Sequence, residues 1–302
     1  MRIHDYRTHN DLKSLEKIVD NNDPSESEDL MKALYPVRDK PIGKLLDKII
    51  KRFSNSAKYD TPMDWFNPTS YKTFMEYFKR SISKPKLEEL QSNIASFDMV
   101  MPCEANIEAI GDFTDSTPIL RLKKTTNDVL KDLAAVGINP LTNEFISFKL
   151  LKCFYHRIHS PVDGTIEDIK FIGKENPLFN NNSLWIVSIA SEHGMVYMLL
   201  VGELSIQDFT FVLKKGDKIK KLEELGNFNW GSQVVIIFEK DLFNGDILIN
   251  QKEKYFVGEG IFSFKERLDV QDLEDMPNTQ IARDQPAYGV TIAAGDTGTT
   301  AL

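Results

Sequence analysis

Two histidines stand close together in a short stretch of the sequence and could do proton chemistry. The stretch is FYHRIHSPVDG, residues 154 to 164, in which His156 and His159 are three positions apart. On a helix this spacing would place both rings on one face, but Pro161 and Gly164 indicate that the segment leaves regular structure. The pair therefore predicts either general acid–base work or two packed structural histidines.

A Gly-Ser dipeptide stands at the head of a buried strand. In GNFNWGSQVVIIFEK, residues 226 to 240, Gly231 and Ser232 come immediately before an apolar run. A hairpin corner is one interpretation, since Gly supplies positive φ and Ser favours turns. A reactive site is the other, because a positioned base makes a serine hydroxyl nucleophilic.

A metal centre at the histidine pair would need a third ligand. Only His193, Cys153 or a carboxylate could supply it, and no zinc-type spacing supports such a set. We therefore expect no metal.

Several segments, taken in order, resemble the pyruvoyl-dependent phosphatidylserine decarboxylase family. HRIHSPVDG precedes GDKIKKLEELGNFNWGSQVVIIFE by about seventy residues, and the two elements are specific as a pair. FKRSISKPK, at 78 to 86, looks like the family's basic segment, and MPCEA, at 101 to 105, falls where the family has a Pro-Ala-Asp-Gly turn. MVYMLLVGELSIQDF, at 195 to 209, is similar to its Val-Gly-Ala strand. The resemblance covers roughly residues 65 to 240.

The resemblance implies a self-processing chain. In such proteins the serine hydroxyl attacks the carbonyl of the preceding glycine, and the chain then breaks and leaves a pyruvoyl group in place of the serine. Applied here, cleavage between Gly231 and Ser232 gives chains 1–231 and 232–302, with the pyruvoyl cofactor formed from Ser232. This group would form a Schiff base with a substrate amine and accept the electron pair left by departing carbon dioxide.

The resemblance also implies roles for the neighbouring residues. His159 is the base for Ser232, and His156 handles the substrate carboxylate and reprotonates the α-carbon, with Tyr155 beside it as a hydrogen-bonding or packing residue. The acid that orients His159 falls at Glu104, where the family has aspartate and where Ala105 replaces the following glycine. The alternative acids are Asp98 and Asp163, the latter in a context typical of a turn former.

Two departures bear on the substrate. Gln233 stands where the family often has threonine, and Glu203 places a carboxylate in the Val-Gly-Ala strand, where it would repel a phosphate or attract a second amine. Phosphatidylserine is the first expectation for the substrate. The alternatives are a soluble decarboxylase of a free, including aromatic, amino acid, and a non-enzymatic binding module on the same fold.

The composition is that of an ordinary globular protein, with 41% hydrophobic and 27% charged residues. A chain of 302 residues can bury roughly 75% of its unfolded surface, so a core needs neither disulfide nor metal. The net charge of -8 argues against nucleic acid as a partner. Two cysteines, Cys103 and Cys153, indicate a reducing compartment. The polar N-terminus and the lack of any window of 18 apolar residues predict a cytoplasmic location, with peripheral attachment to a membrane as the alternative.

The pattern of apolar and turn-forming residues along the chain predicts an α+β fold. Residues 1–95 read as an N-terminal helical region, residues 96–268 as a β-rich catalytic domain of the phosphatidylserine-decarboxylase type, and residues 269–302 as a loosely ordered tail. Helices are expected at 40–53, 71–79 and 126–136, strands at 184–190, 195–201, 209–213, 234–238 and 255–257, and a hairpin turn at 215–217.

The predicted helix 40–53 is basic and amphipathic. Residues 37–53 carry a net charge of +4 in a chain whose total is negative, since six Lys and Arg stand against two Asp. Such a helix can contact anionic lipid, or it can pack its apolar face on the core and leave its lysines in water. The family resemblance further implies a homodimer of processed two-chain units.

Overall fold

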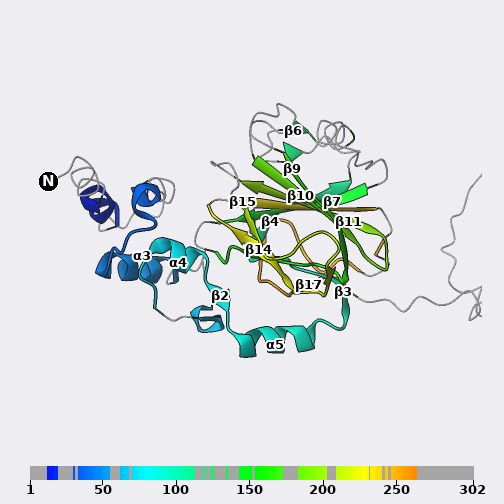
Figure 1. Cartoon of the computed structure of the whole chain (residues 1–302), viewed down its shortest axis with the longest axis horizontal. Coiled ribbons are helices and arrows are strands. Elements are labelled where there is room, and N and C mark those ends of the chain that lie inside the picture. The colour runs from blue at the N-terminus through cyan, green and yellow to red at the C-terminus, as the bar shows by residue number, and fades with distance from the viewer. Residues whose placement is uncertain are drawn as a thin grey trace, which may run out of the picture. The chain divides into compact units, whose positions relative to one another are not determined.

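The chain divides into two units, residues 1–264 and 265–302. The predicted tail 269–302 and, apart from residue 134, the predicted helix 126–136 lie outside the residues that the structure describes. The computed structural model (Figure 1) describes residues 12–19, 30, 33–54, 62–67, 70–112, 118–119, 124–125, 134, 143–151, 154–172, 183–202, 209–230, 232–239, 242–243 and 246–263.

The N-terminal part of the chain is helical, as predicted. Residues 12–19 are helical. They are followed by η2 (Tyr35–Val37), α3 (Lys44–Ser54), η3 (Met63–Trp65), α4 (Phe74–Phe78) and α5 (Lys84–Asn93). Helix α3 begins later than the predicted residue 40 because Gly43, with φ of 54°, lies in the left-handed region just before it. Helix α4 begins after Thr73, whose Oγ1 accepts a hydrogen bond from the Glu76 N–H at 3.1 Å and so caps the first turn.

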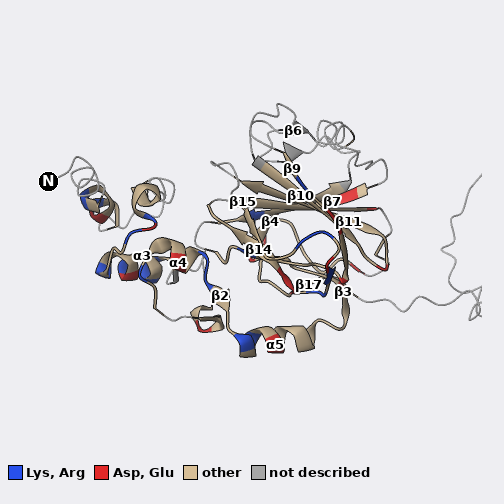
Figure 2. Cartoon of the chain, viewed as in Figure 1, with Lys and Arg blue, Asp and Glu red and all other residues tan. Residues whose placement is uncertain are grey.

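Helix α3 packs its apolar face on the core. Leu45, Leu46, Ile49 and Phe53 are all less than 9% exposed, while Lys44, Lys48 and Lys51 are exposed. Figure 2 shows Lys and Arg along this helix. The apolar stripe is therefore not free to insert into a bilayer, and only the cationic face remains for a membrane contact. Within the described ranges no helix is long and apolar enough to cross a membrane.

The β-rich part is built on one antiparallel sheet of eight strands. Its order is β13 (Lys218–Ile219), β9 (Gly164–Ile172), β10 (Ser183–Ala190), β11 (Met195–Gly202), β15 (Ser232–Glu239), β7 (Asn143–Leu150), β4 (Ala105–Asp112) and β16 (Lys254–Tyr255). A second sheet orders β12 (Phe209–Phe211), β14 (Glu224–Phe228) and β8 (Arg157–His159). Three strand pairs complete the set: β17 (Gly260–Ser263) with β3 (Phe97–Val100), β1 (Phe66–Asn67) with β2 (Ser81–Ile82), and β5 (Pro118–Ile119) with β6 (Lys124–Thr125).

The predicted strands 184–190, 195–201, 209–213 and 234–238 correspond to β10, β11, β12 and β15, whereas the predicted strand 255–257 overlaps β16 only at Tyr255. The α+β fold class is confirmed. The predicted hairpin at 215–217 is wrong in one respect. Gly216 makes a turn with φ of 89°, but the turn joins β12 to β13, which belong to different sheets. The local sequence specified the turn, whereas pairing depends on the partners available at each sheet edge.

Strand β15 is buried on both of its faces. Val234 and Ile236 lie in the main hydrophobic core, and Val235 and Ile237 lie in a second cluster. Because neither face meets water, the strand reads in the sequence as a continuous apolar run rather than as an alternation.

The strands that follow residue 231 are interleaved with strands that precede it. Strand β15 lies between β11 and β7, β16 pairs with β4, and β17 pairs with β3. A break in the chain at residue 231 would therefore leave the two pieces joined by sheet hydrogen bonds and by a shared core.

Candidate active site

The Gly-Ser dipeptide stands in the sequence between a strand of the second sheet and a central strand of the eight-stranded sheet. Strand β14 ends at Phe228, and β15 begins at Ser232, whose backbone is in register with Gly202 of β11 and Leu150 of β7. Gly231 and the side chain of Ser232 lie outside the described residues. The surroundings of the dipeptide are defined by the residues on either side of it.

One aromatic ring connects His156 with the residue before Gly231. Strand β14 pairs with β8, and the Phe228 N–H donates to the His156 carbonyl at 3.0 Å. The rings of Trp230 and Phe78 stack with centroids 5.8 Å apart, and Phe78 stacks in turn on the His156 imidazole at 3.8 Å. The structure thus brings His156 and the residue before the predicted cleavage site into one aromatic stack.

His156 is fully buried, and a backbone carbonyl orients its ring. Its Nδ1 lies 2.8 Å from the Phe154 carbonyl oxygen, which also accepts a hydrogen bond from Arg80 Nη1 at 3.2 Å. A carbonyl only accepts, so Nδ1 carries the proton, and in the neutral ring Nε2 is the basic atom.

His159 is held in the same tautomer. Its Nδ1 donates to the Leu222 carbonyl at 2.7 Å, and its Nε2 accepts from the Tyr155 hydroxyl at 2.9 Å. Burial lowers the pKa of His159 below its ordinary value and outweighs the Leu222 carbonyl, which acts in the opposite direction. Burial likewise raises the pKa of Tyr155, so the phenol keeps its proton. A neutral imidazole with a basic Nε2 is the form that a general base requires.

The structure shows other partners for Glu104 and for both ring nitrogens of His159, contrary to the contact that the prediction assigned to them. Its Oε1 lies 2.9 Å from Lys254 Nζ, and its Oε2 accepts from the Tyr155 N–H at 2.8 Å. Arg80 Nη2 is 4.0 Å from the same carboxylate. The physical reason is that the Leu222 carbonyl already occupies the ring nitrogen that an acid would bind. The catalytic roles assigned to Ser232, His156 and His159 stay predictions.

Arg80 and Lys254 belong to the site, and the sequence reasoning missed both. Arg80 is 1% exposed, donates to the carbonyls of Tyr77 and Phe154, and lies over the rings of Phe66 and Tyr77. An arginine inside the segment FKRSISKPK, beside the aromatic residues of 74–78, was the available signal. Together with Glu104, these two cations hold the segment 154–156, which carries the first histidine: Arg80 and Lys254 contact Phe154, and Glu104 accepts from the Tyr155 N–H.

The loop that holds His159 is strained. Leu222 has φ of 66°, a conformation that costs a non-glycine residue about 1–3 kcal/mol. Asp163 supports this loop, since its Oδ1 accepts from the Lys221 N–H at 2.7 Å. The second alternative acid, Asp98, lies 3.8 Å from His193. Asp163 therefore acts on His159 only through the loop, as its turn-forming context suggested.

Gly164, the last residue of the histidine motif, is required by a close approach of two strands. A Cβ at this position would lie 2.5 Å from the Ala190 carbonyl oxygen, so β9 could not pack against β10 with a larger residue.

Gln233 is buried beside the site and bonds to polar side chains of the neighbouring strands. Its Nε2 donates to Ser147 Oγ at 2.8 Å and to Glu108 Oε2 at 3.1 Å. Glu203 and Cys153 lie outside the described residues. Within the described ranges no group of three His, Cys, Asp or Glu side chains could hold a metal ion.

The Gly-Ser dipeptide heads a central strand, and the residue before it is linked through the Phe78 ring to a buried histidine, which fits a pyruvoyl-dependent carboxy-lyase. The family comparison agrees with this class. The chain belongs to the phosphatidylserine decarboxylase family, whose model matches residues 74–263.

Curated relatives carry the same description. The chain is 30% identical over 190 residues to a phosphatidylserine decarboxylase proenzyme of Anoxybacillus flavithermus, covering 58% of this chain and 70% of the relative. It is 29% identical over 205 residues to a phosphatidylserine decarboxylase proenzyme 2 of Komagataella phaffii, covering 61% of this chain but only 20% of the relative. A proenzyme 2 of Oryza sativa subsp. japonica is 26% identical over 227 residues, with 68% and 35% covered. The matched part of the chain thus covers between 20% and 70% of the length of these relatives.

Proposed function

We propose that this chain cleaves itself between Gly231 and Ser232 and then decarboxylates phosphatidylserine to phosphatidylethanolamine. The observation that carries the proposal is the stack of His156, Phe78 and Trp230, in which one aromatic ring separates a buried histidine from the residue that precedes the dipeptide. The names of the curated relatives support the same reaction.

The residues present fit a pyruvoyl group derived from Ser232. Strand β15 stays paired with β11 and β7 on both sides, so a group at its first residue would remain anchored after the chain is cut. When formed, this group supplies an electron sink for the carbon dioxide that leaves.

The proton chemistry falls to the two histidines. For cleavage, His159 takes the hydroxyl proton of Ser232 on Nε2, after the hydrogen bond from the Tyr155 hydroxyl to that atom has broken. The Leu222 carbonyl keeps the ring in the required tautomer. For decarboxylation, His156 delivers a proton to the substrate α-carbon. Phe78 and Trp230 exclude water from this side of the site.

A peripheral membrane contact through residues 40–53 belongs to the same proposal. Because the apolar face of α3 is buried, the contact is electrostatic, between lysines and anionic head groups, and it weakens with salt. A dimer of two-chain units is proposed on the family resemblance alone, and light scattering measures it.

The test is intact mass. The unaltered chain should give two polypeptides split at 231/232, the smaller one beginning with a pyruvoyl group, while Ser232→Ala should give one chain without activity. A Ser232→Ala protein that still splits at this position refutes the proposal. Carbon dioxide release from phosphatidylserine vesicles, compared with free serine and tryptophan, separates the lipid substrate from the free amino acids.

A further inference from the structure

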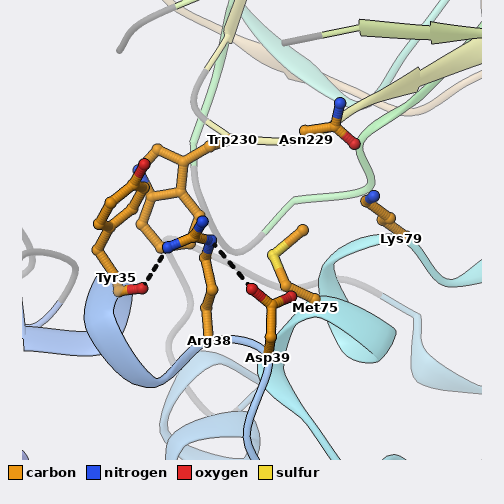
Figure 3. A pocket seen from close by; sticks show the side chains of 7 residues that line it. All are labelled: Tyr35, Arg38, Asp39, Met75, Lys79, Asn229 and Trp230. Atoms are coloured by element: carbon orange, nitrogen blue, oxygen red, sulfur yellow. Dashed lines mark hydrogen bonds and ion pairs between the residues drawn. The ribbon is translucent and has the colours of Figure 1, made fainter. Parts of the chain in front are cut away.

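A pocket opens directly beside the residues that precede the predicted cleavage site. It has a volume of about 190 Å³. Figure 3 shows its walls, which come from the N-terminal helical region on one side and from the chain after β14 on the other. Polar and aromatic side chains line it: Tyr35, Arg38, Asp39, Lys79, Asn229 and Trp230.

Arg38 is fixed in this pocket before any ligand arrives. Its Nη1 donates to the Tyr35 carbonyl at 2.6 Å, its guanidinium lies 3.9 Å from the centre of the Tyr35 ring, and its Nε is 3.5 Å from Asp39 (Figure 3). Since one carboxylate and one carbonyl use only part of the guanidinium, N–H donors remain for a ligand. A pinned guanidinium loses little entropy when it binds an anion.

Lys79 supplies the second positive charge. No described side chain or carbonyl lies within hydrogen-bond or ion-pair distance of its ammonium, which is half-buried at the end of α4. Burial lowers the pKa of Lys79, with Arg157 and Arg38 acting in the same direction and Asp39 against them. An anion in the pocket would stabilise the charged form of Lys79, because it places a negative charge next to the half-buried ammonium.

We infer that this pocket binds a singly charged phosphoryl group, held by Arg38 and Lys79 beside Asn229 and Trp230, and that this group is the phosphodiester of the substrate; the second part rests on the proposed function. Two cations against Asp39 leave a net charge of +1, which matches one phosphodiester charge. The planar guanidinium suits bidentate binding to phosphate oxygens.

The reach of the substrate fits this position. Trp230 lines the pocket and precedes Ser232 by two positions, a span of at most about 7 Å along an extended chain. In a serine phosphodiester the amine and the phosphorus are separated by about four covalent bonds, a distance of similar order. The phosphate can therefore occupy the pocket while the amine lies at the head of β15.

The test uses the uncut Ser232→Ala chain, so that binding is measured independently of cleavage and turnover. The probes for isothermal titration calorimetry are glycerophosphoserine, inorganic phosphate and L-serine. The altered proteins carry Arg38→Gln, Lys79→Gln or both. The matched control is Lys84→Gln with Lys218→Gln, which removes two positive charges from exposed lysines outside the pocket. Circular dichroism confirms that each variant folds.

We expect glycerophosphoserine to bind, and L-serine to bind at least about tenfold more weakly. Each single substitution should raise the dissociation constant of glycerophosphoserine about tenfold, and the control substitutions should leave it unchanged. Arg38→Lys should recover part of the loss. If inorganic phosphate binds as tightly as glycerophosphoserine, the pocket is still a phosphoryl site, but its ligand is free phosphate.

Two results overturn the inference: equal binding of L-serine and glycerophosphoserine, or unchanged binding when both Arg38 and Lys79 are replaced. If the chain that retains Ser232 never cleaves while the Ser232→Ala chain binds the phosphodiester through these residues, the proposed function is refuted and the phosphoryl site remains supported.

Discussion

Glu104→Gln distinguishes a structural carboxylate from a catalytic one. The side chain is 2% exposed, and it neutralises Lys254 at 2.9 Å and faces Arg80 at 4.0 Å. An amide of the same shape can still accept the hydrogen bond from the Tyr155 N–H, but it removes the negative charge that faces the buried Arg80 and the partly buried Lys254. Breaking a buried pair in this way costs about 3–5 kcal/mol of the free energy of unfolding. We expect about 3 kcal/mol, at the low end of that range, because Lys254 is 18% exposed and can turn toward water.

Urea unfolding followed by circular dichroism measures this cost. The background is Ser232→Ala, so that every sample is a single chain. With an m value of about 3 kcal/mol/M, the unfolding midpoint should fall by about 1 M. Glu88→Gln is the matched control, since Glu88 pairs with Lys84 at 3.8 Å on the surface and should cost less than about 0.5 kcal/mol.

Self-cleavage of the chain that retains Ser232 gives the second readout. His159 keeps its bonds to Leu222 and Tyr155 in the Glu104→Gln protein, so we expect the cleavage rate to stay within about threefold of that of the unaltered chain. A cleavage rate reduced about a hundredfold with an unchanged urea midpoint would refute this reasoning, because Glu104 would then act on the histidine directly.

Three further predictions follow from the same geometry. His159→Gln should slow self-cleavage by about 10²- to 10⁴-fold, whereas His156→Gln should cleave at a nearly normal rate and lose decarboxylation activity by a similar factor. Mass spectrometry measures cleavage, and carbon dioxide release measures decarboxylation. Equal losses in both steps for both variants would contradict the division of roles. Because the pKa of His159 is lowered from 6.5, the stability that depends on its neutral form is complete above pH 6.5 and is lost as pH falls toward the lowered pKa. Urea midpoints measured from pH 7 downward should therefore decrease, and the His159→Gln chain should lack this contribution to the decrease. Gly226→Ala should cost about 2 kcal/mol or more, because φ is 153° and a Cβ would lie 2.1 Å from the Thr210 carbonyl oxygen; an unchanged urea midpoint would show that β14 can move away from β12.

Much of the fold could be predicted from the sequence. Strands β10, β11 and β15 were recognisable because their apolar runs are long and end at turn residues, and α3 because its apolar residues recur at helical spacing. The pairing could not be predicted. The turn at Gly216 looked like a hairpin because turn chemistry is local, whereas the two strands that it joins pair with β14 and β9 from other parts of the chain.

The site was predictable only as far as its side chains carry motifs. His156, His159 and the Gly-Ser dipeptide were found because their types and spacing are unusual. The carbonyls of Phe154 and Leu222 were not, because every residue has a carbonyl and only the fold decides where it points. The acid was therefore sought among carboxylates, and Glu104 was assigned a contact that a backbone carbonyl makes.

A carbonyl in place of a carboxylate changes what His159 can do. Both groups fix the tautomer by accepting the Nδ1 proton, but a neutral carbonyl gives less electrostatic support to the imidazolium that forms when Nε2 takes a proton. With burial also disfavouring that charge, His159 is a weak base that accepts a proton only for as long as the attack lasts. Such a base suits the proposed self-cleavage, because each chain would perform that reaction only once and a slow rate would not limit later turnover. The proposal gives the repeated step, decarboxylation, to His156. The Phe154 carbonyl that orients its ring also binds the buried Arg80 guanidinium, whereas the Leu222 carbonyl that orients His159 lies in a loop.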